Sequence, residues 1–215
     1  MRPTVFAIPL LGILLVAGCA ATLGDGVEAS EMREVEAFDG VHVQNGIRAE
    51  VIVGEQRVLD VRADSNLLEL IETTTGGGSL SIFTSAAVEP VIPPEVSFGS
   101  SRLTFMTARE TGTVGLAHRI VAERFGAAAS NGAALQVGGA CRTLDAIASD
   151  DGHLDAQSLR CDDVQVDAQG GSVVEVTALR RVEVHASGES TVIVRGNPSE
   201  VVEFLTDGST LTIVP

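Results

Sequence analysis

The repeat that decides the fold is clearest in the stretch Ala129–Gly152, which reads ASNGAALQVGGACRTLDAIASDDG. Each end of this stretch has a small residue, then polar residues, then a glycine, and apolar and polar residues alternate between the two ends. The motif recurs along the chain with its glycines at Gly132, Gly152, Gly171, Gly188 and Gly208, which are 20, 19, 17 and 20 residues apart. Period-two alternation predicts strands, and glycine supplies the positive φ that tight turns need.

A unit of about 20 residues with two short strands cannot bury its own apolar face, whereas stacked copies can. The repeats, clearest over 126–215, therefore predict an all-β solenoid, a parallel β-helix with one coil per repeat. A β-sandwich of regular hairpins is the competing fold, but independent hairpins would not reproduce one motif in register. We expect a single domain over 35–215, with an irregular loop or cap over 86–118, where prolines interrupt the alternation.

Residues 1–18 have the features of a bacterial lipoprotein signal peptide. Arg2 precedes an apolar stretch, Val5–Val16, which is shorter than the ~20 residues that a bilayer span needs. The stretch runs into Ala17, Gly18 and Cys19, and two small residues before a cysteine resemble a lipobox. The alternative is an ordinary secretory signal followed by a chance cysteine.

Acylation of Cys19 would attach the chain to a lipid bilayer, and a set of two or three acyl chains holds a protein there stably. We therefore expect a lipid-anchored protein of the cell envelope, with a flexible polar tether over 19–34. Ala20, in place of Asp, favours the outer membrane, facing the periplasm or the surface, if the source is Gram-negative.

The remaining two cysteines test the stacking. Cys141 lies nine residues after Gly132, and Cys161 lies nine residues after Gly152, so they occupy the same position in consecutive coils. Neighbouring strands are about 4.8 Å apart, and a disulfide needs a Cα–Cα distance of about 4.4–6.8 Å. An exported protein would oxidise such a pair, so we expect a disulfide. Two free buried thiols, or two outward side chains that never pair, are the alternatives.

Composition excludes one class of partner. The formal net charge is −15, all 14 cationic residues are arginine, and the chain has no Trp and no Tyr. Nucleic acids need phosphate-binding charge and aromatic stacking platforms, so we expect no nucleic-acid partner.

Candidate chemistry is confined to carboxylates. Asp150, Asp151 and Asp163 lie on two adjacent predicted coils, and a carbohydrate-active β-helix enzyme, a polysaccharide hydrolase or lyase, would use such acids. The competing interpretation is turn chemistry, because Asp and Asn tolerate left-handed backbone in turns. We favour the turn interpretation, since Lys, Trp and Tyr to hold a sugar are absent. The histidines have no metal-ligand spacing, and we expect no metal and no cofactor; they are His42, His118, His153 and His185.

The domain resembles the head GIN domain family of auto-transporter adhesins, a domain of unknown function. The resemblance is carried by Phe38–Val41, Gly46–Gly54 and the turn Ala186–Ser190, and it covers roughly 35–215. It implies a right-handed parallel β-helix at the cell surface or in the periplasm. The family has no established catalytic residues to transfer, and residues 86–118 depart from its pattern.

These observations predict a non-enzymatic, membrane-anchored surface or periplasmic lipoprotein that acts in adhesion, binding or as a scaffold. The expected partner is a polysaccharide or another envelope protein, besides the bilayer. No capping helix follows the last predicted coil, so a homo-oligomer is also open. The alternative function is the carbohydrate-active enzyme.

Overall fold

The protein is represented by a computed structural model that describes residues 20–54 and 58–215. Within these residues the secondary structure consists of strands β1–β17 and one short 3₁₀ helix, η1 (Leu68–Leu70), so the expectation of an all-β fold is confirmed. The described residues contain no helix with the length and apolar character of a membrane span. The predicted signal peptide and Cys19 lie outside the described residues.

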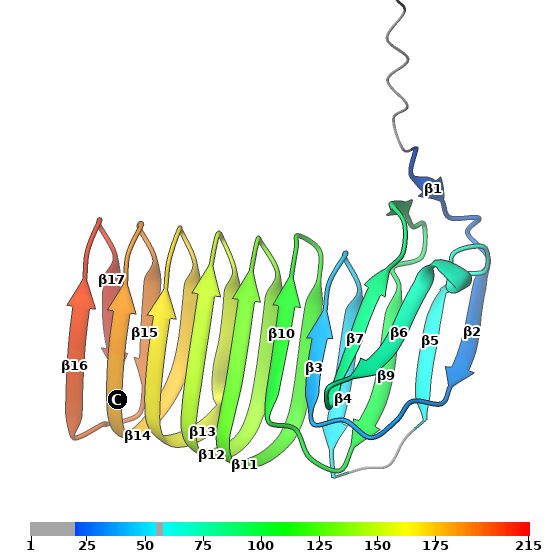
Figure 1. The fold of residues 1–215 in the computed structure, drawn as a ribbon. Helices are drawn as coiled ribbons and strands as arrows, with labels where there is room; N and C mark the ends of the chain where they lie inside the picture. The colour runs from blue at the N-terminus through cyan, green and yellow to red at the C-terminus, as the bar shows by residue number, and fades with distance from the viewer. Residues whose placement is uncertain (1–19, 55–57) are drawn as a thin grey trace, which may run out of the picture.

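Four long strands form the centre of a stack of coils, and they are β11 (Val114–Ser130), β12 (Ala134–Ser149), β13 (His153–Ala168) and β14 (Val173–Ala186). Each strand crosses one face of the stack, bends, and returns along the other face (Figure 1). Neighbours are parallel and in register, so that Leu135 pairs with Leu154 and Leu154 pairs with Val174. The prediction of a parallel β-helix with coils of about 20 residues is confirmed.

The C-terminal coils are built from shorter strands, β15 (Thr191–Arg195), β16 (Glu200–Leu205) and β17 (Thr210–Val214). Strand β15 continues the face formed by the first part of β14, and β17 pairs with β15. Strand β16 continues the other face, because it pairs with the second part of β14.

The first coil is interrupted by an insertion. Strands β3 (Gly40–Val43) and β4 (Arg48–Val53) stack in parallel on β10 (Phe105–Arg109) and β11, respectively. Between β4 and β10 the chain adds β5 (Leu59–Asp64), β6 (Ile71–Gly76), β7 (Ser79–Thr84), β8 (Val88–Glu89) and β9 (Glu95–Ser100). Strand β7 pairs with β3 and strand β9 pairs with β4, both in parallel, so they extend the two faces. Strand β5 pairs with β9 and strand β6 pairs with β7, both in the antiparallel sense, and these two strands cap that end of the stack.

Residues 86–118 are not an irregular segment throughout, which corrects the expectation from the sequence. They contain β8, β9, β10 and the start of β11, and the irregular parts are the loop around Pro90, Pro93 and Pro94 and the short connections 101–104 and 110–113. The alternation here is short, and the partner strands lie far back in the chain: β4 precedes β9 by 47 residues and β11 by 66, and β3 precedes β10 by 65. No local period therefore revealed the coil.

The expected flexible tether is likewise ordered from Thr22 onward. Strand β1 (Thr22–Leu23) pairs with β8, and β2 (Glu28–Arg33) pairs in the antiparallel sense with β5. Arg33 also donates to the carbonyl of Leu68 at 2.9 Å. The polar composition of this segment hid the order, because its partner strands lie 26 to 66 residues away in the chain.

The core runs along the inside of the coils. Inward positions carry Val, Leu, Ile and Ala, and next to the turns a column of small side chains forms from Ala129, Ala148, Ala168 and Ala186, all of them buried. Small residues at this position let successive coils stack closely, since side chains in a packed interior leave no room for a larger group.

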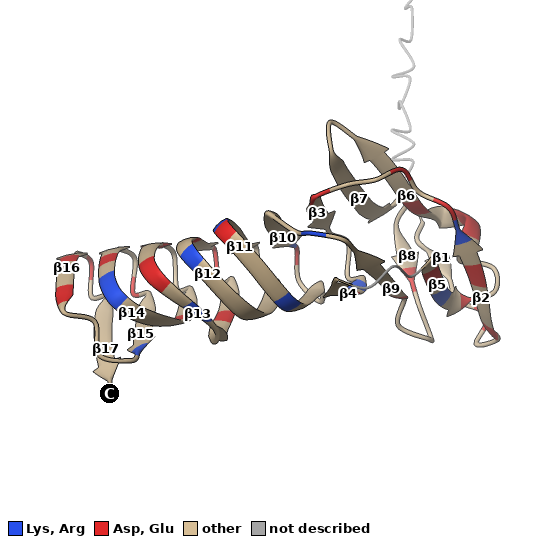
Figure 2. Cartoon of the chain, turned by 90° about the horizontal axis from the view of Figure 1, so that it is seen from below, with Lys and Arg blue, Asp and Glu red and all other residues tan. Residues whose placement is uncertain are grey.

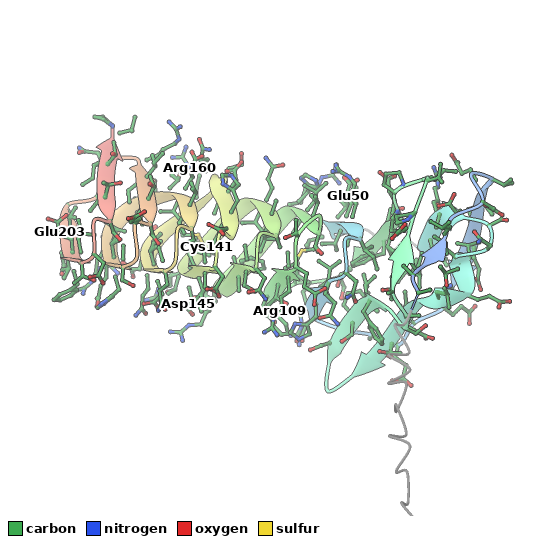
Figure 3. All side chains as sticks on the ribbon, turned by 90° about the horizontal axis from the view of Figure 1, so that it is seen from above. Glu50, Arg109, Cys141, Asp145, Arg160 and Glu203 are labelled. Carbon is green, nitrogen blue, oxygen red and sulfur yellow. A yellow bond between two sulfur atoms is a disulfide. The ribbon has the colours of Figure 1, made fainter. Side chains whose placement is uncertain are left out.

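The last coil presents part of this interior to solvent. Val201 is 40% exposed and Ile213 is 43% exposed, although both pair with buried residues of the preceding coil. Glu203 follows Val201 by two residues on β16 and pairs with the fully buried Val184, so it occupies an inward position at the end of the stack (Figure 3). Inward-pointing charges at exposed sheet edges are a known obstacle to edge-to-edge association.

Replacing Glu203 by valine is expected to increase self-association, because it turns the end of the stack into an apolar surface with unpaired backbone groups. Sedimentation velocity over a range of concentrations would show a higher average mass than the parent chain. Glu200→Gln, which removes an outward charge from the same strand, is the control. An unchanged mass for Glu203→Val at every concentration would contradict the prediction.

Candidate binding surfaces

Cys141 and Cys161, which lie at equal offsets from their turn glycines, form a disulfide. Cys141 of β12 and Cys161 of β13 are register partners with a Cα–Cα distance of 4.6 Å, and their sulfurs are bonded. Both side chains are buried, and the bond closes a loop of one coil, with a sequence separation of 20. The predicted disulfide is confirmed, and the alternatives of free or outward thiols are wrong.

Removal of this bond, as Cys141→Ala with Cys161→Ala, is expected to lower the free energy of unfolding by about 3 kcal/mol, the chain-entropy value for a loop of this length. Chemical denaturation of the two proteins would measure the difference. A reductant should shift the midpoint of the parent and leave that of the double variant unchanged. Equal midpoints for parent and variant without reductant would refute the expectation.

The acidic residues Asp150 and Asp151 serve the turn between β12 and β13. Both have left-handed backbone, with φ of 51° and 61°, and both side chains are exposed. Their amides donate to the carbonyls of Gln169 and Gly170 in the next coil, at 3.2 and 2.9 Å. Asp is one of the few residues other than glycine that adopts this conformation readily, so the backbone itself accounts for these two residues.

Asp163 lies away from that turn. It follows the bend of β13, and the five residues 164–168 of the returning strand separate it from the next turn, a length of about 16 Å at ~3.3 Å per residue. Its carboxylate is ion-paired with Arg180. The structure therefore does not bring the three candidate acids together. Within residues 20–54 and 58–215, no three His, Cys, Asp or Glu side chains form a group that could hold a metal ion.

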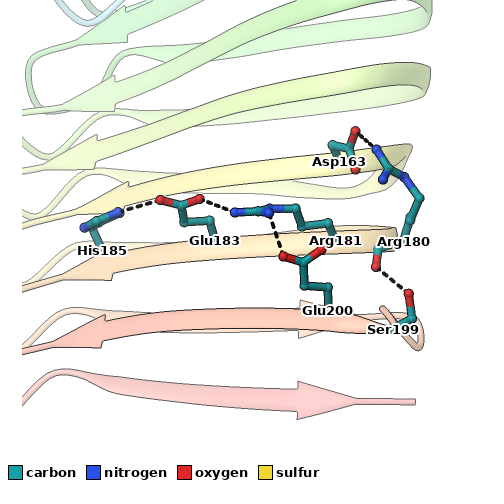
Figure 4. Close-up of polar contacts among 7 residues, drawn as sticks. All are labelled: Asp163, Arg180, Arg181, Glu183, His185, Ser199 and Glu200. Atoms are coloured by element: carbon teal, nitrogen blue, oxygen red, sulfur yellow. Dashed lines mark hydrogen bonds and ion pairs between the residues drawn. The ribbon is translucent and has the colours of Figure 1, made fainter.

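Arg180 and Arg181, which lie in β14 beside Asp163, belong to a surface ladder of charges (Figure 4). Arg181 contacts Glu183 at 2.7 Å and Glu200 at 2.6 Å, and His185 lies 3.2 Å from Glu183 and stacks on Phe204. The hydrogen bond from Arg181, and then the one from His185, lower the pKa of Glu183. Such exposed pairs contribute little to stability, and each guanidinium here is already paired, so the ladder is not an anion site.

Charges are interspersed along the remaining coils as well (Figure 2). Arg124 faces Asp145 at 3.9 Å, and His118 faces Glu50 at 3.3 Å. His42 contacts Thr107 at 2.7 Å, and burial, followed by the charge of Arg109, lowers the pKa of its ring. Each of these two histidines therefore contacts a side chain on the neighbouring paired strand.

The face formed by β4 and the first parts of β11, β12 and β13 carries a hollow of about 290 Å³. Val114, Leu116 and Ala134 form an apolar floor there, although all three occupy outward positions of their strands. The hollow arises because Ala134 is small beside its register partners Val114 and His153.

Polar groups surround this floor. The rim consists of Arg48, Gln136, His153 and Asp155, and the amide of Gln136 donates to the carboxylate of Asp155 at 3.1 Å. A larger hollow of about 550 Å³ lies beside the segment 33–38 after β2, and another of about 610 Å³ lies beside the loop after β7. Loop residues line much of both hollows. The hollow over β4–β13 is lined by strand residues alone, which hold side chains more rigidly than loops do.

Sequence reasoning missed this hollow. Its signal was Leu116 at an outward position, where the following coils have Gln136, Asp155 and Glu175. Without the register between coils, this apolar residue could not be distinguished from the core.

The fold and these surfaces define a small parallel β-helix protein whose described residues present flat, ladder-like strand faces. The chain belongs to the family described as "Putative auto-transporter adhesin, head GIN domain", whose model matches residues 37–198. The resemblance seen in the sequence is thereby confirmed.

Solved structures share the fold at low sequence identity. A putative adhesin from Bacteroides fragilis has 13% identity and a TM-score of 0.67, with 90% of this chain and 99% of that chain covered. A putative adhesin from Parabacteroides merdae has 12% identity and a TM-score of 0.56, covering 91% and 99%. A putative lipid binding protein from Parabacteroides distasonis has 12% identity and a TM-score of 0.52, covering 91% and 100%. No curated protein matches the chain.

Proposed function

We propose that this protein is a non-enzymatic binding module of the bacterial cell envelope, anchored to a bilayer through acylated Cys19, and that the hollow over β4–β13 contacts a polysaccharide. The hollow is the observation that carries this proposal. Its apolar floor suits the apolar face of a sugar ring, and the amide and carboxylate of Gln136 and Asp155 suit hydroxyl groups.

Two further observations support a binding role over catalysis. The family description and the name of the Bacteroides fragilis structure both refer to adhesins. The acids considered for a hydrolase or lyase, Asp150, Asp151 and Asp163, lie at different edges of the coil, where they serve a turn and an ion pair.

The binding test uses the full chain against a panel of envelope and extracellular polysaccharides, scored for retention and for new reducing ends or unsaturated products. We expect retention without product. Ala134→Trp, which fills the hollow, should abolish retention, whereas Ala128→Trp, at an outward position on the opposite face of β11, should preserve it.

Three results would contradict this function. Product that disappears in Asp150→Ala or Asp151→Ala would identify an enzyme. Retention that survives Ala134→Trp would move the site away from the hollow. Failure to retain any glycan would refute the polysaccharide and direct the search to an envelope protein.

The anchor has its own test. The intact mass of the mature chain isolated from bacterial membranes should include acyl chains on Cys19, and Cys19→Ala should leave the chain unacylated and absent from the membrane fraction. A mature chain without acyl groups would refute the anchor while leaving the binding test unaffected.

A further inference from the structure

The N-terminal end of the domain exposes an apolar cluster. Leu23 is 65% exposed, Val27 is 59% exposed and Val91 is 66% exposed. The loop 85–94, which contains β8, has a single charged residue, Glu89, and is otherwise composed of small and apolar residues, namely Ser85, Ala86, Ala87, Val88, Pro90, Val91, Ile92, Pro93 and Pro94. Strands β1 and β8 pair side by side here (Figure 1), so the N-terminal arm, residues 20–33, and the loop 85–94 present one surface.

Hydrogen bonds fix this surface to the domain. The carboxylate of Asp64 is fully buried and accepts the amides of Gly26, Val91 and Ile92 at 2.8, 2.9 and 3.1 Å. Asn66 accepts the amide of Asp25 at 3.0 Å, on the same arm.

The arm is held at its beginning as well. Thr22 donates its amide to the carbonyl of Ala87 at 2.9 Å, and Asn66 donates to the carbonyl of Leu23 at 2.8 Å. The arm and the loop are therefore one body with the cap from Thr22 onward.

The position of this surface follows from the sequence. Only Ala20 and Ala21 separate Cys19 from Thr22, so three Cα–Cα steps span at most about 11 Å. The headgroup layer on one side of a bilayer is roughly 5–8 Å thick. If the acyl chains of Cys19 lie in the hydrocarbon, this reach keeps the β1–β8 end within the headgroup layer or within a few Å of its outer edge.

We infer that the apolar cluster of Leu23, Val27 and the loop 85–94 docks on the same bilayer that holds the acyl chains of Cys19. This inference rests on the acylation proposed above. The second contact fixes the orientation of the domain, because apolar side chains at the interface add to the binding by the acyl chains. The coil stack then extends sideways from the membrane contact (Figure 1).

The charges near the cluster indicate the type of lipid. Asp25, Glu28 and Glu89 are exposed and acidic, and the loop 85–94 has no arginine. Arg33, at the far end of the arm, donates to the carbonyl of Leu68 at 2.9 Å. An anionic surface would repel the acidic side chains, so a zwitterionic headgroup is the matching partner.

Because the chain has no Trp and no Tyr, a single introduced tryptophan would dominate the protein fluorescence. Val91→Trp would be made in the acylated full chain, purified and reconstituted in phosphatidylcholine vesicles with and without brominated acyl chains. The control is Val121→Trp, which places the same reporter at an 81% exposed position of β11, away from the cap. The intact mass of each protein establishes acylation of Cys19 before the measurement.

We expect the emission maximum of the tryptophan at position 91 to move to shorter wavelength when vesicles are present. Brominated acyl chains should quench about half of its fluorescence intensity, because interfacial side chains sit about 5–10 Å into the headgroup boundary. The reporter at position 121 should show neither change. Leu23→Asp, added to Val91→Trp, should weaken the quenching. Vesicles of phosphatidylglycerol should quench less than those of phosphatidylcholine.

An acylated protein whose reporter at position 91 is no more quenched than the one at position 121 would overturn the docking and leave the anchor intact. If the emission maximum at position 91 changes with protein concentration and not with lipid, the cluster contacts a second copy of the chain. That result would also overturn the docking on the bilayer. A protein without acyl groups would overturn both the anchor and the docking, and the mass identifies that case.

Discussion

Alanine at position 139 is expected to lower the free energy of unfolding by about 4 kcal/mol, the sum of backbone strain and overpacking. Gly139 has a φ of 141°, which side-chain-bearing residues rarely adopt, and a Cβ there would lie 2.1 Å from the carbonyl oxygen of Ile120. The obstacle is backbone of the preceding coil, at the point where β11 and β12 shift register, so no side chain can move to relieve it.

The adjacent glycine provides a matched control. A Cβ at Gly138 would lie 3.4 Å from the Cβ of Ser158, which is close to an ordinary contact, and its backbone is not left-handed. Gly138→Ala should therefore change the free energy of unfolding by less than about 1 kcal/mol. Chemical denaturation of the two variants and the parent measures both values. Similar losses for the two alanines would show that the bulge adapts and that our account of Gly139 is wrong.

Removing the carboxylate of Asp64 is the second large change. Asp64→Ala leaves the part-buried amides of Gly26, Val91 and Ile92 without their acceptor, and a hydrogen bond to a charged group contributes about 1.5–3 kcal/mol. We expect a loss of about 4 kcal/mol, limited by detachment of the arm from the cap. Hydrogen exchange should become faster in 22–33 and 88–92, and limited proteolysis should cleave there first.

Asp60→Ala is the control for Asp64→Ala. Asp60 lies on the same strand, but its partner is the exposed Arg62 at 3.1 Å, and surface pairs of this kind contribute at most about 1 kcal/mol. It should leave exchange of the arm unchanged. Slow exchange of residues 22–33 in Asp64→Ala would mean that strand pairing between β2 and β5 alone holds the arm.

The sequence by itself determined the architecture and the disulfide. Both depend on a local period: the glycine turns set the coil length, alternation sets which side chains face inward, and equal offsets place Cys141 opposite Cys161. The same turns explain Asp150 and Asp151, because left-handed backbone is a local requirement.

Only the tertiary structure decided the cap, the arm and the binding surfaces. Asp64 meets Gly26 and Val91 across 38 and 27 residues, and the hollow depends on register between coils that brings Val114 beside Ala134. A charged residue read in sequence looks solvated, and an apolar residue looks buried. Partners distant in the chain reverse both expectations here, since burial and exposure are set by what packs against a side chain rather than by its own chemistry.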